Sequence, residues 1–153
     1  MTVIAWDGKT LAADKRCNAG GLATTVTKIH RVPQGIVAFC GNVERALEVL
    51  QWLRVGADPA EWTCEMRASG WPNVLLITHR GDVLEYGSTP YPVCYEDRFT
   101  AAGTGRDYAM AAMHLGKTAR EAVEVACLFD VSCGNGIDML ELDEALCSLK
   151  LSA

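Results

Sequence analysis

The sequence predicts an α+β protein in which antiparallel sheets are covered by helices. Two observations carry this prediction. Short apolar runs come in pairs joined by tight-turn residues, which is typical of hairpins. In three other segments the apolar residues recur at spacings of three and four, which is typical of helices. The order is strands, helix, strands, two helices and a last strand, and this partial segregation argues against a doubly wound parallel sheet.

Length and charge narrow the class of protein. The chain has 153 residues, of which 50% are hydrophobic, and a formal net charge of −5. This length suffices for one substantial core, so we expect a single domain over residues 1–153. The basic residues are scattered, which argues against nucleic acid as a partner. No apolar run approaches the roughly 20 residues that cross a bilayer, and no secretion signal is evident, so we expect a cytoplasmic protein that does not bind membranes.

Strand signals dominate the first 40 residues. Residues 3–6 and 10–13 form a hairpin around Asp7-Gly8, a dipeptide that favours the positive φ angles of a tight turn. A stretch rich in Gly and Thr follows from residue 18 to residue 27. Two further strands are then predicted on either side of Pro33-Gln34-Gly35.

Three segments have helical periodicity. The first runs from Asn42 to Arg54, with Asn42 placed to cap it and Gly56 placed to end it. The second, from Arg106 to Leu115, is apolar around most of its circumference, which predicts that it is sandwiched between other layers. The third opens with the capping box Thr118 to Glu121 and continues to Leu128.

The remaining segments are strands and irregular stretches. Strands are predicted on both sides of Arg80-Gly81, within residues 90–105, and from Ile137 to Leu142. Residues 58–72 show no clear period and are interpreted as a loop or a broken helix. The last residues, 143–153, are compatible with a short helix.

The cysteines and histidines do not form a metal-binding pattern. The seven cysteines are odd in number and never spaced as CxxC, so we interpret them as reduced, small core residues. The histidines stand far apart and are interpreted as surface or loop residues. We therefore expect no metal and no cofactor. The residues concerned are Cys17, Cys40, Cys64, Cys94, Cys127, Cys133, Cys147, His30, His79 and His114.

Thr2 is the first candidate for chemistry. A threonine hydroxyl is a poor nucleophile without a base, and the α-amine of the same residue is such a base once Met1 is removed. Most of an amine with a pKa of about 8 is protonated at pH 7, but a nearby lysine ammonium lowers that pKa by like-charge repulsion. A buried lysine needs a carboxylate partner. Lys28 and Asp14 are the candidates for this pair.

At this point the sequence shows a resemblance to a known family. The segments TVIAWDGKTLAADKR, VTKI and AAGTG, in this order, resemble the catalytic β-type subunits of the proteasome family, especially the bacterial HslV type and its short bacterial and phage relatives. The resemblance covers nearly the whole chain. It implies the four-layer αββα sandwich of the N-terminal nucleophile hydrolases, in which the three helical segments are the covering layers.

The resemblance also implies roles for single residues. Thr2 falls on the family's nucleophile, Asp14 on the Asp that ends the second strand, and Lys28 on the Lys that heads the next strand. Thr104, within Gly103-Thr104-Gly105, falls on a serine whose hydroxyl lies beside the N-terminal amine. The resemblance thus implies that the side chains of these residues lie together around the α-amine of Thr2.

A later motif of the family, Asp-x-x-Ser-Gly, corresponds to residues 130–134. It places Asp130 and Cys133 beside the amine, with Cys133 where a serine is usual and Ser132 as an alternative. The resemblance places the oxyanion-binding backbone N–H at Ala38, where the family commonly has Gly. The residues expected to line an apolar specificity pocket are Ile36 and Cys40.

The pairing within the first hairpin has two readings. A two-residue loop at Asp7-Gly8 places Met1 opposite Asp14. A longer loop from Asp7 to Thr10, which we favour, places Thr2 opposite Asp14. The register matters because a shift of one residue changes which side chain lies opposite Asp14.

The resemblance implies a threonine endopeptidase that acts on peptides or unfolded proteins. Its subunits would assemble into a homo-oligomeric ring that confines proteolysis to a chamber, with an unfoldase ATPase as a further partner. Two alternatives remain open. One is a noncatalytic ring-forming scaffold of the same fold that retains Met1, and the other is an amidase that acts on a small metabolite.

Overall fold

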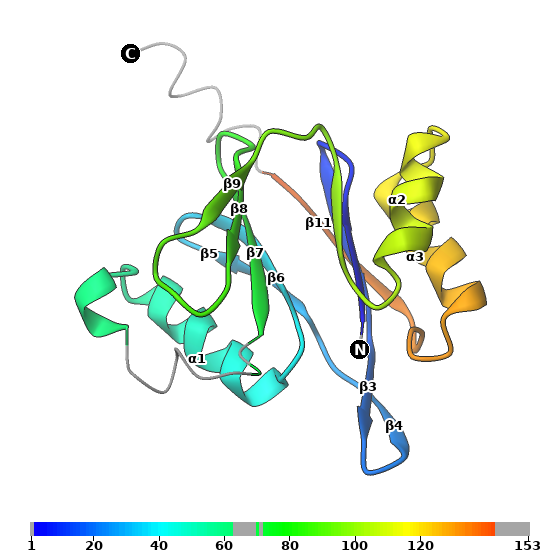
Figure 1. The fold of residues 1–153 in the computed structure, drawn as a ribbon, viewed down its shortest axis with the longest axis horizontal. Helices are drawn as coiled ribbons and strands as arrows, with labels where there is room; N and C mark the ends of the chain where they lie inside the picture. The colour runs from blue at the N-terminus through cyan, green and yellow to red at the C-terminus, as the bar shows by residue number, and fades with distance from the viewer. Residues whose placement is uncertain (1, 63–69, 71, 143–153) are drawn as a thin grey trace.

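The structure, a computed structural model, describes residues 2–62, 70 and 72–142. Within these residues two antiparallel sheets face each other and helices cover their outer faces (Figure 1). The architecture is the four-layer αββα sandwich that the resemblance implies. The predicted segregation of strands and helices is thus confirmed.

The first sheet holds the beginning of the chain at its centre. Its strand order is β10-β1-β2-β11, formed by β10 (Thr100–Gly103), β1 (Val3–Trp6), β2 (Thr10–Asp14) and β11 (Ile137–Glu141). Helices α2 (Arg106–His114) and α3 (Ala119–Phe129) cover its outer face. Thr118 and Glu121 form the capping box at the start of α3, as predicted.

The second sheet follows the order of the chain. It contains β5 (Ile29–Val32), β6 (Gly35–Cys40), β7 (Asn73–Thr78), β8 (Val83–Tyr86) and β9 (Val93–Tyr95). Helix α1 (Val43–Arg54) covers its outer face, and a short 3₁₀ turn, η1 (Pro59–Glu61), follows. The side chain of Asn42 caps α1 by accepting a hydrogen bond from the N–H of Arg45, as the sequence predicts.

Three apolar layers hold the four structural layers together. Successive residues of a strand point to opposite faces of a sheet, so β1 directs Val3 and Ala5 toward α2 and α3 but Ile4 and Trp6 toward the other sheet. Because both faces are covered, all four residues of β1 are buried. This burial explains why the first strand is a continuous apolar run and does not alternate with polar residues.

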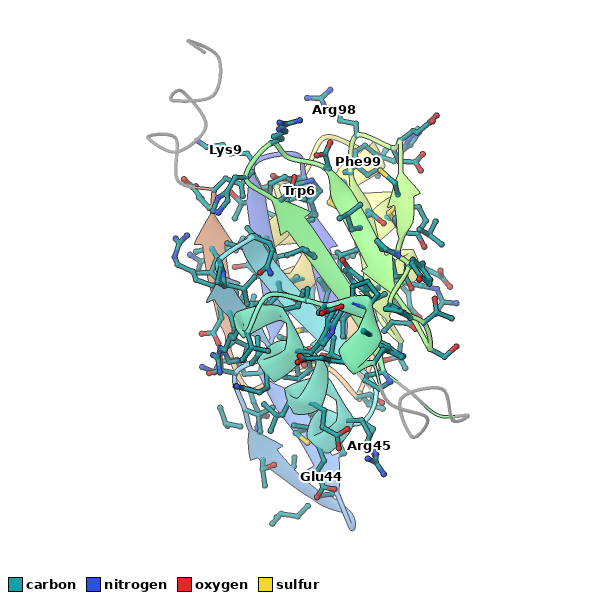
Figure 2. All side chains as sticks on the ribbon, turned by 90° about the vertical axis from the view of Figure 1, so that its left-hand side faces the viewer. Trp6, Lys9, Glu44, Arg45, Arg98 and Phe99 are labelled. Atoms are coloured by element: carbon teal, nitrogen blue, oxygen red, sulfur yellow. The ribbon has the colours of Figure 1, made fainter. Side chains whose placement is uncertain are left out.

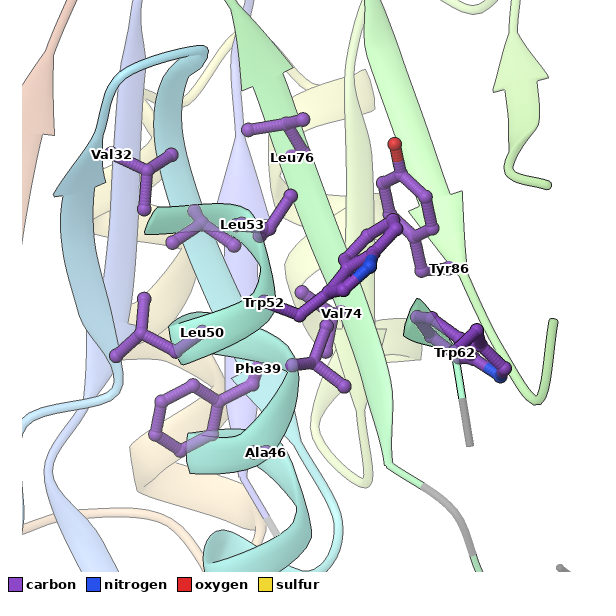
Figure 3. Packing of buried hydrophobic residues seen from close by; sticks show 12 residues of the cluster. Val32, Phe39, Ala46, Leu50, Trp52, Leu53, Trp62, Val74, Leu76 and Tyr86 are labelled. Carbon is purple, nitrogen blue, oxygen red and sulfur yellow. The ribbon is translucent and has the colours of Figure 1, made fainter. Parts of the chain in front are cut away.

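The layer under α1 is the most aromatic. Trp52 of α1 makes edge-to-face contacts with Trp62 and with Tyr86 of β8, at ring-centroid distances of 4.9 and 5.5 Å (Figure 3). The indole N–H of Trp52 donates to the carbonyl of Asp58, and that of Trp62 donates to the carbonyl of Ser88. Both buried indoles therefore have a hydrogen-bond partner, as this environment requires.

A third, two-stranded sheet extends from one end of the molecule. It consists of β3 (Arg16–Ala19) and β4 (Leu22–Thr25), which are joined at Gly20-Gly21 (Figure 1). The sequence did not predict this hairpin within the Gly/Thr-rich stretch. Glu44 and Arg45 lie toward the same end, whereas Lys9 and Arg98 lie at the opposite end (Figure 2).

Two further predictions need correction, and a third is untested. Helix α2 is not sandwiched: it buries one face, while Tyr108 and the following Leu115 are exposed. Its alanines and methionines suggest burial all round, yet it belongs to an outer layer. The region of residues 90–105 contains two strands, not one, and the expected short helix after residue 142 lies outside the described residues.

The first hairpin has the longer of the two loops considered. Trp6 pairs with Leu11, and the carboxylate of Asp7 accepts hydrogen bonds from the N–H groups of Lys9 and Thr10. The same ladder pairs Ile4 with Ala13, so Asp14 lies level with Val3 instead of Thr2. The expected position of Thr2 directly opposite Asp14 is therefore wrong by one residue.

Gly103 permits the close approach of β10 to the second residue of the chain. Its φ is +91°, and a Cβ at this position would lie 2.1 Å from the carbonyl oxygen of Thr2. Gly116 has nearly the same φ, +89°, but open space around it. Both positions therefore carry the cost of a positive φ for a residue with a side chain, whereas only Gly103 adds the cost of a clash.

We predict that Gly103→Ala lowers the free energy of unfolding more than Gly116→Ala does. The positive φ costs about 1–2 kcal/mol at either position, and the clash at Gly103 adds about 1–3 kcal/mol. Urea unfolding of both variants measures the difference. Equal losses in the two variants would contradict the close approach.

Candidate active site

The centre of the site is the carboxylate of Asp14, at the end of β2. Its side chain is fully buried. It accepts five hydrogen bonds: at Oδ1 from Thr2 Oγ1 (2.6 Å), Lys28 Nζ (2.7 Å) and Val3 N (3.0 Å), and at Oδ2 from Gly134 N (2.9 Å) and Arg16 N (3.1 Å). Burial of a charged group is costly unless it is paired and hydrogen-bonded, and both conditions are met here.

Thr2 and Lys28 complete a buried polar triad with this carboxylate. The ammonium of Lys28 donates to the hydroxyl of Thr2 as well as to Asp14, and only 1% of Thr2 and 3% of Lys28 are exposed. The carbonyl of Thr2 accepts from the N–H of Gly105 (3.2 Å) and from Thr104 Oγ1 (3.4 Å). The second residue of the chain is therefore fixed at its backbone and at its side chain.

A loop between α3 and β11 brings Asp130 and Cys133 to the same place. The thiol of Cys133 donates to Asp130 Oδ2 (3.4 Å) and lies 4.0 Å from Thr104 Oγ1. The hydroxyl of Thr104, followed by the N–H of Ser132, holds the pKa of Asp130 below its ordinary value. Burial, with the charges of Asp14 and Asp130, raises the pKa of Cys133 to about 12, so its thiol stays protonated and can donate.

Arg16 holds this loop against the hairpin that follows Asp14. Its guanidinium donates to the carbonyl of Val131 (2.6 Å) and to Oδ1 of Asn135 (3.1 Å). It also packs closely on Gly134, where an added Cβ would come within 2.8 Å of it. This contact keeps the N–H of Gly134 directed at Asp14.

A small cavity of about 60 Å³ opens beside Thr2. Its walls come from β3, from the end of β6 and from the beginning of α1. The residues that line it are Thr2, Arg16, Cys17, Asn18, Lys28, Phe39, Cys40, Gly41 and Val43.

The structure brings together six of the residues singled out by the resemblance. They are Thr2, Asp14, Lys28, Thr104, Asp130 and Cys133. Of the three expected around the substrate, Cys40 lines the cavity. Ala38 and Ile36 do not: both are fully buried in the layer between the sheets.

Sequence reasoning missed Arg16, most of the cavity wall, and the role of the Gly134 N–H as a donor to Asp14. The one available signal was the position of Arg16 two residues after Asp14. Backbone donors such as the N–H of Gly134 carry no sequence signal, because every residue except proline has one.

Metal-binding clusters and membrane-spanning helices are both absent from the described residues. No group of three or more His, Cys, Asp or Glu side chains among them is placed to hold a metal ion. Also among them, no helix combines the length and the apolar character needed to cross a bilayer. The thiols of Cys17, Cys40, Cys94, Cys127 and Cys133 are all free, and Cys94 is exposed, contrary to the expectation of core cysteines.

Comparison with known proteins identifies relatives along nearly the whole chain. Proteasome subunit beta 1 of Thermococcus onnurineus and of Thermococcus kodakarensis are each 27% identical to this chain, over 93% of it and 86% of their own length. The chain is thus similar to proteasome β subunits along nearly its whole length. No family model matches the sequence.

Solved structures support the sandwich fold of this chain. Thiobacillus denitrificans BPH in complex with epoxomicin superimposes with a TM-score of 0.69 at 22% identity, over 94% of this chain and all of that one. The eukaryotic HslV from Trypanosoma brucei gives a TM-score of 0.65 at 19% identity, over 92% of this chain and 98% of that one. Both have the sandwich fold described above.

We predict that Asp14→Asn strongly destabilises the protein. The substitution leaves the ammonium of Lys28 buried without an anionic partner, which costs about 3–5 kcal/mol. Asp138→Asn is the matched control, because it breaks an ion pair with Lys15 that is partly exposed and costs about 1 kcal/mol or less. Urea unfolding gives both values, and equal losses would rule out a special role for the buried pair.

We also predict that Arg16→Gln loosens the loop of residues 130–136. Hydrogen bonds from charged groups contribute about 1.5–3 kcal/mol, so amide exchange at Gly134 should accelerate at least about tenfold. Arg45→Gln, which removes an exposed ion pair with Glu48 on α1, is the control and should leave this rate unchanged. Unaltered exchange in Arg16→Gln would show that the loop is held by other contacts.

Proposed function

We propose that the protein is a threonine peptidase whose nucleophile is the hydroxyl of Thr2. One observation carries the proposal: this hydroxyl lies in a buried cluster with the carboxylate of Asp14 and the ammonium of Lys28. The ion pair is excluded from solvent and surrounds the hydroxyl of Thr2. Three well-packed apolar side chains would stabilise the fold at this place at least as well. The chemistry of the cluster, in contrast, is that of an activated nucleophile.

The reaction requires that the bond between Met1 and Thr2 is cleaved. The freed α-amine then accepts the proton of Thr2 Oγ1 as this oxygen attacks the carbonyl carbon of a peptide bond. The amine passes the proton to the leaving nitrogen as the C–N bond breaks, and an ester on Thr2 remains. Water hydrolyses the ester and restores the hydroxyl.

Lys28 has two effects in this mechanism. Its positive charge lowers the pKa of the neighbouring amine, so that more of the amine is neutral and able to act as a base. Its hydrogen bond to Thr2 Oγ1 also stabilises negative charge that develops on this oxygen during attack. Asp14 keeps the ammonium in position and offsets its charge.

Thr104, Asp130 and Cys133 form the second polar group of the site. We propose that they orient the α-amine, because Thr104 already contacts the carbonyl of Thr2 and links to the other two. The cavity beside Thr2 would receive the substrate side chain that precedes the scissile bond. Phe39, Cys40 and Val43 contribute apolar atoms to its wall, which favours a small apolar side chain.

The assembly and the partners are also part of the proposal, and the relatives support the assembly. Because the curated relatives are proteasome β subunits and one structural relative is an HslV, we propose that this chain forms a homo-oligomeric ring in the cytoplasm. The ring would confine peptides or unfolded proteins as substrates. An unfoldase ATPase would supply them.

The test combines intact mass with a covalent probe. We expect the assembled protein to begin at Thr2 and to gain one equivalent of epoxomicin on its N-terminal peptide, as measured by mass spectrometry. Thr2→Ala should lose the adduct and at least about 10³-fold of peptide hydrolysis, the scale seen when a nucleophile is removed. Thr2→Ser retains a hydroxyl and should recover part of both.

Two outcomes would contradict the proposal. Retention of Met1 in the assembled particle would leave the amine blocked and favour the scaffold. An unblocked Thr2 that hydrolyses simple amides but no peptide would favour the small-molecule amidase. Thr89→Ala, at a partly exposed residue in a loop away from Thr2, is the control for nonspecific effects of losing a threonine.

A further inference from the structure

Two cysteines from different strands line the cavity beside Thr2. Cys17 lies in β3 and Cys40 at the end of β6, and both are partly buried. Cys40 packs against the apolar layer between the sheets, on the side of Thr2 and Lys28. The mechanism proposed above uses neither thiol.

The other described cysteines differ from this pair. Cys94 is exposed on β9, away from the cavity. Cys127 and Cys133 pack in the layer under α2 and α3, where burial raises the pKa of their thiols to about 11 and about 12. Burial, together with the charge of Glu85, raises the pKa of the Cys40 thiol as well. What distinguishes Cys17 and Cys40 is therefore their access to the cavity.

The size of the cavity makes it sensitive to any added group. Its volume is about 60 Å³, whereas pockets for drug-sized ligands span about 300–1,000 Å³. A substituent of a few heavy atoms on either sulfur would therefore fill most of the space that a substrate side chain needs. Thr2 lines the same cavity, so access to it would be reduced as well.

We propose that the cavity is a site of reversible thiol modification, at which a low-molecular-weight disulfide reacts with Cys17 or Cys40 and prevents substrate from reaching Thr2. The inference rests on the proposed peptidase function. The cysteine sulfur, as thiolate, attacks one sulfur of the disulfide and a mixed disulfide forms. The original S–S bond breaks, and the other half leaves as a thiol that carries the proton released by the cysteine. Excess thiol reverses the exchange.

The test uses 2-hydroxyethyl disulfide, a small and uncharged reagent, on the assembled protein with Thr2 unblocked. We expect peptide hydrolysis to fall at least about tenfold, with the modification mapped to Cys17 or Cys40 by peptide mass spectrometry. Dithiothreitol should restore hydrolysis. The Cys94→Ser variant should be equally sensitive, because its thiol lies away from the cavity.

The decisive variant is the double substitution Cys17→Ala with Cys40→Ala. Its hydrolysis after treatment, relative to its own untreated rate, should remain near unity. If the double variant still loses hydrolysis on treatment, the inference is overturned. It is also overturned if the wild type keeps full activity after Cys17 or Cys40 is modified, or if the reagent modifies neither cysteine.

These outcomes separate the inference from the proposed function. If peptide hydrolysis is normal before treatment and unchanged once Cys17 or Cys40 is modified, the inference is overturned but the proposed function is not. Absence of any peptide hydrolysis before treatment overturns the proposed function, and the inference with it.

Discussion

The buried carboxylate of Asp14 is the constraint on which the rest of the structure depends. It joins five donors from four parts of the chain: the first strand, the residue that leads into β5, the start of β3 and the loop before β11. A buried anion tolerates few alternative arrangements, because each missing donor costs free energy that the solvent cannot restore. The position of Thr2 is therefore a consequence of how the sandwich closes around one charge.

The apolar layers make that closure possible. The central strands of both sheets are covered on both faces, so the polar triad lies at the end of two apolar layers and not on a flexible surface loop. Gly103 and Gly105 allow β10 and α2 to approach Thr2 and Val3 closely. Small residues and a dense core thus place the hydroxyl with little freedom, as preorganised catalysis requires.

The spacing of residues close together in the sequence predicted many of the elements of this arrangement. Contacts between residues far apart in the sequence determined the others. The capping box at Thr118 and the N-cap at Asn42 could be read from the sequence because they depend on residues three apart. The Asp14–Lys28 pair emerged from the chemistry that Thr2 requires and from family resemblance. The contact of Arg16 with Val131 could not be predicted, because it joins an ordinary arginine to a carbonyl 115 positions away.

Two predictions failed for different reasons. The longer loop from Asp7 to Thr10 is present, but it pairs Trp6 with Leu11 and so sets Val3, not Thr2, level with Asp14. Helix α2 was expected to be sandwiched because alanine and methionine suit a buried helix, yet they also suit the inner face of an outer layer. For α2 the deciding contacts lie in the neighbouring layers, beyond the reach of local pattern.

The anchoring of the β3–β4 hairpin at its base has a consequence for how this scaffold tolerates change. Arg16 ties the base to the loop of Val131 and Asn135, while the tip at Gly20-Gly21 meets no atom within 4 Å of an added Cβ. Added length at the tip therefore leaves the base of the hairpin, beside Asp14, in place. Evolution, or a protein engineer, can insert a recognition element there without displacing Thr2.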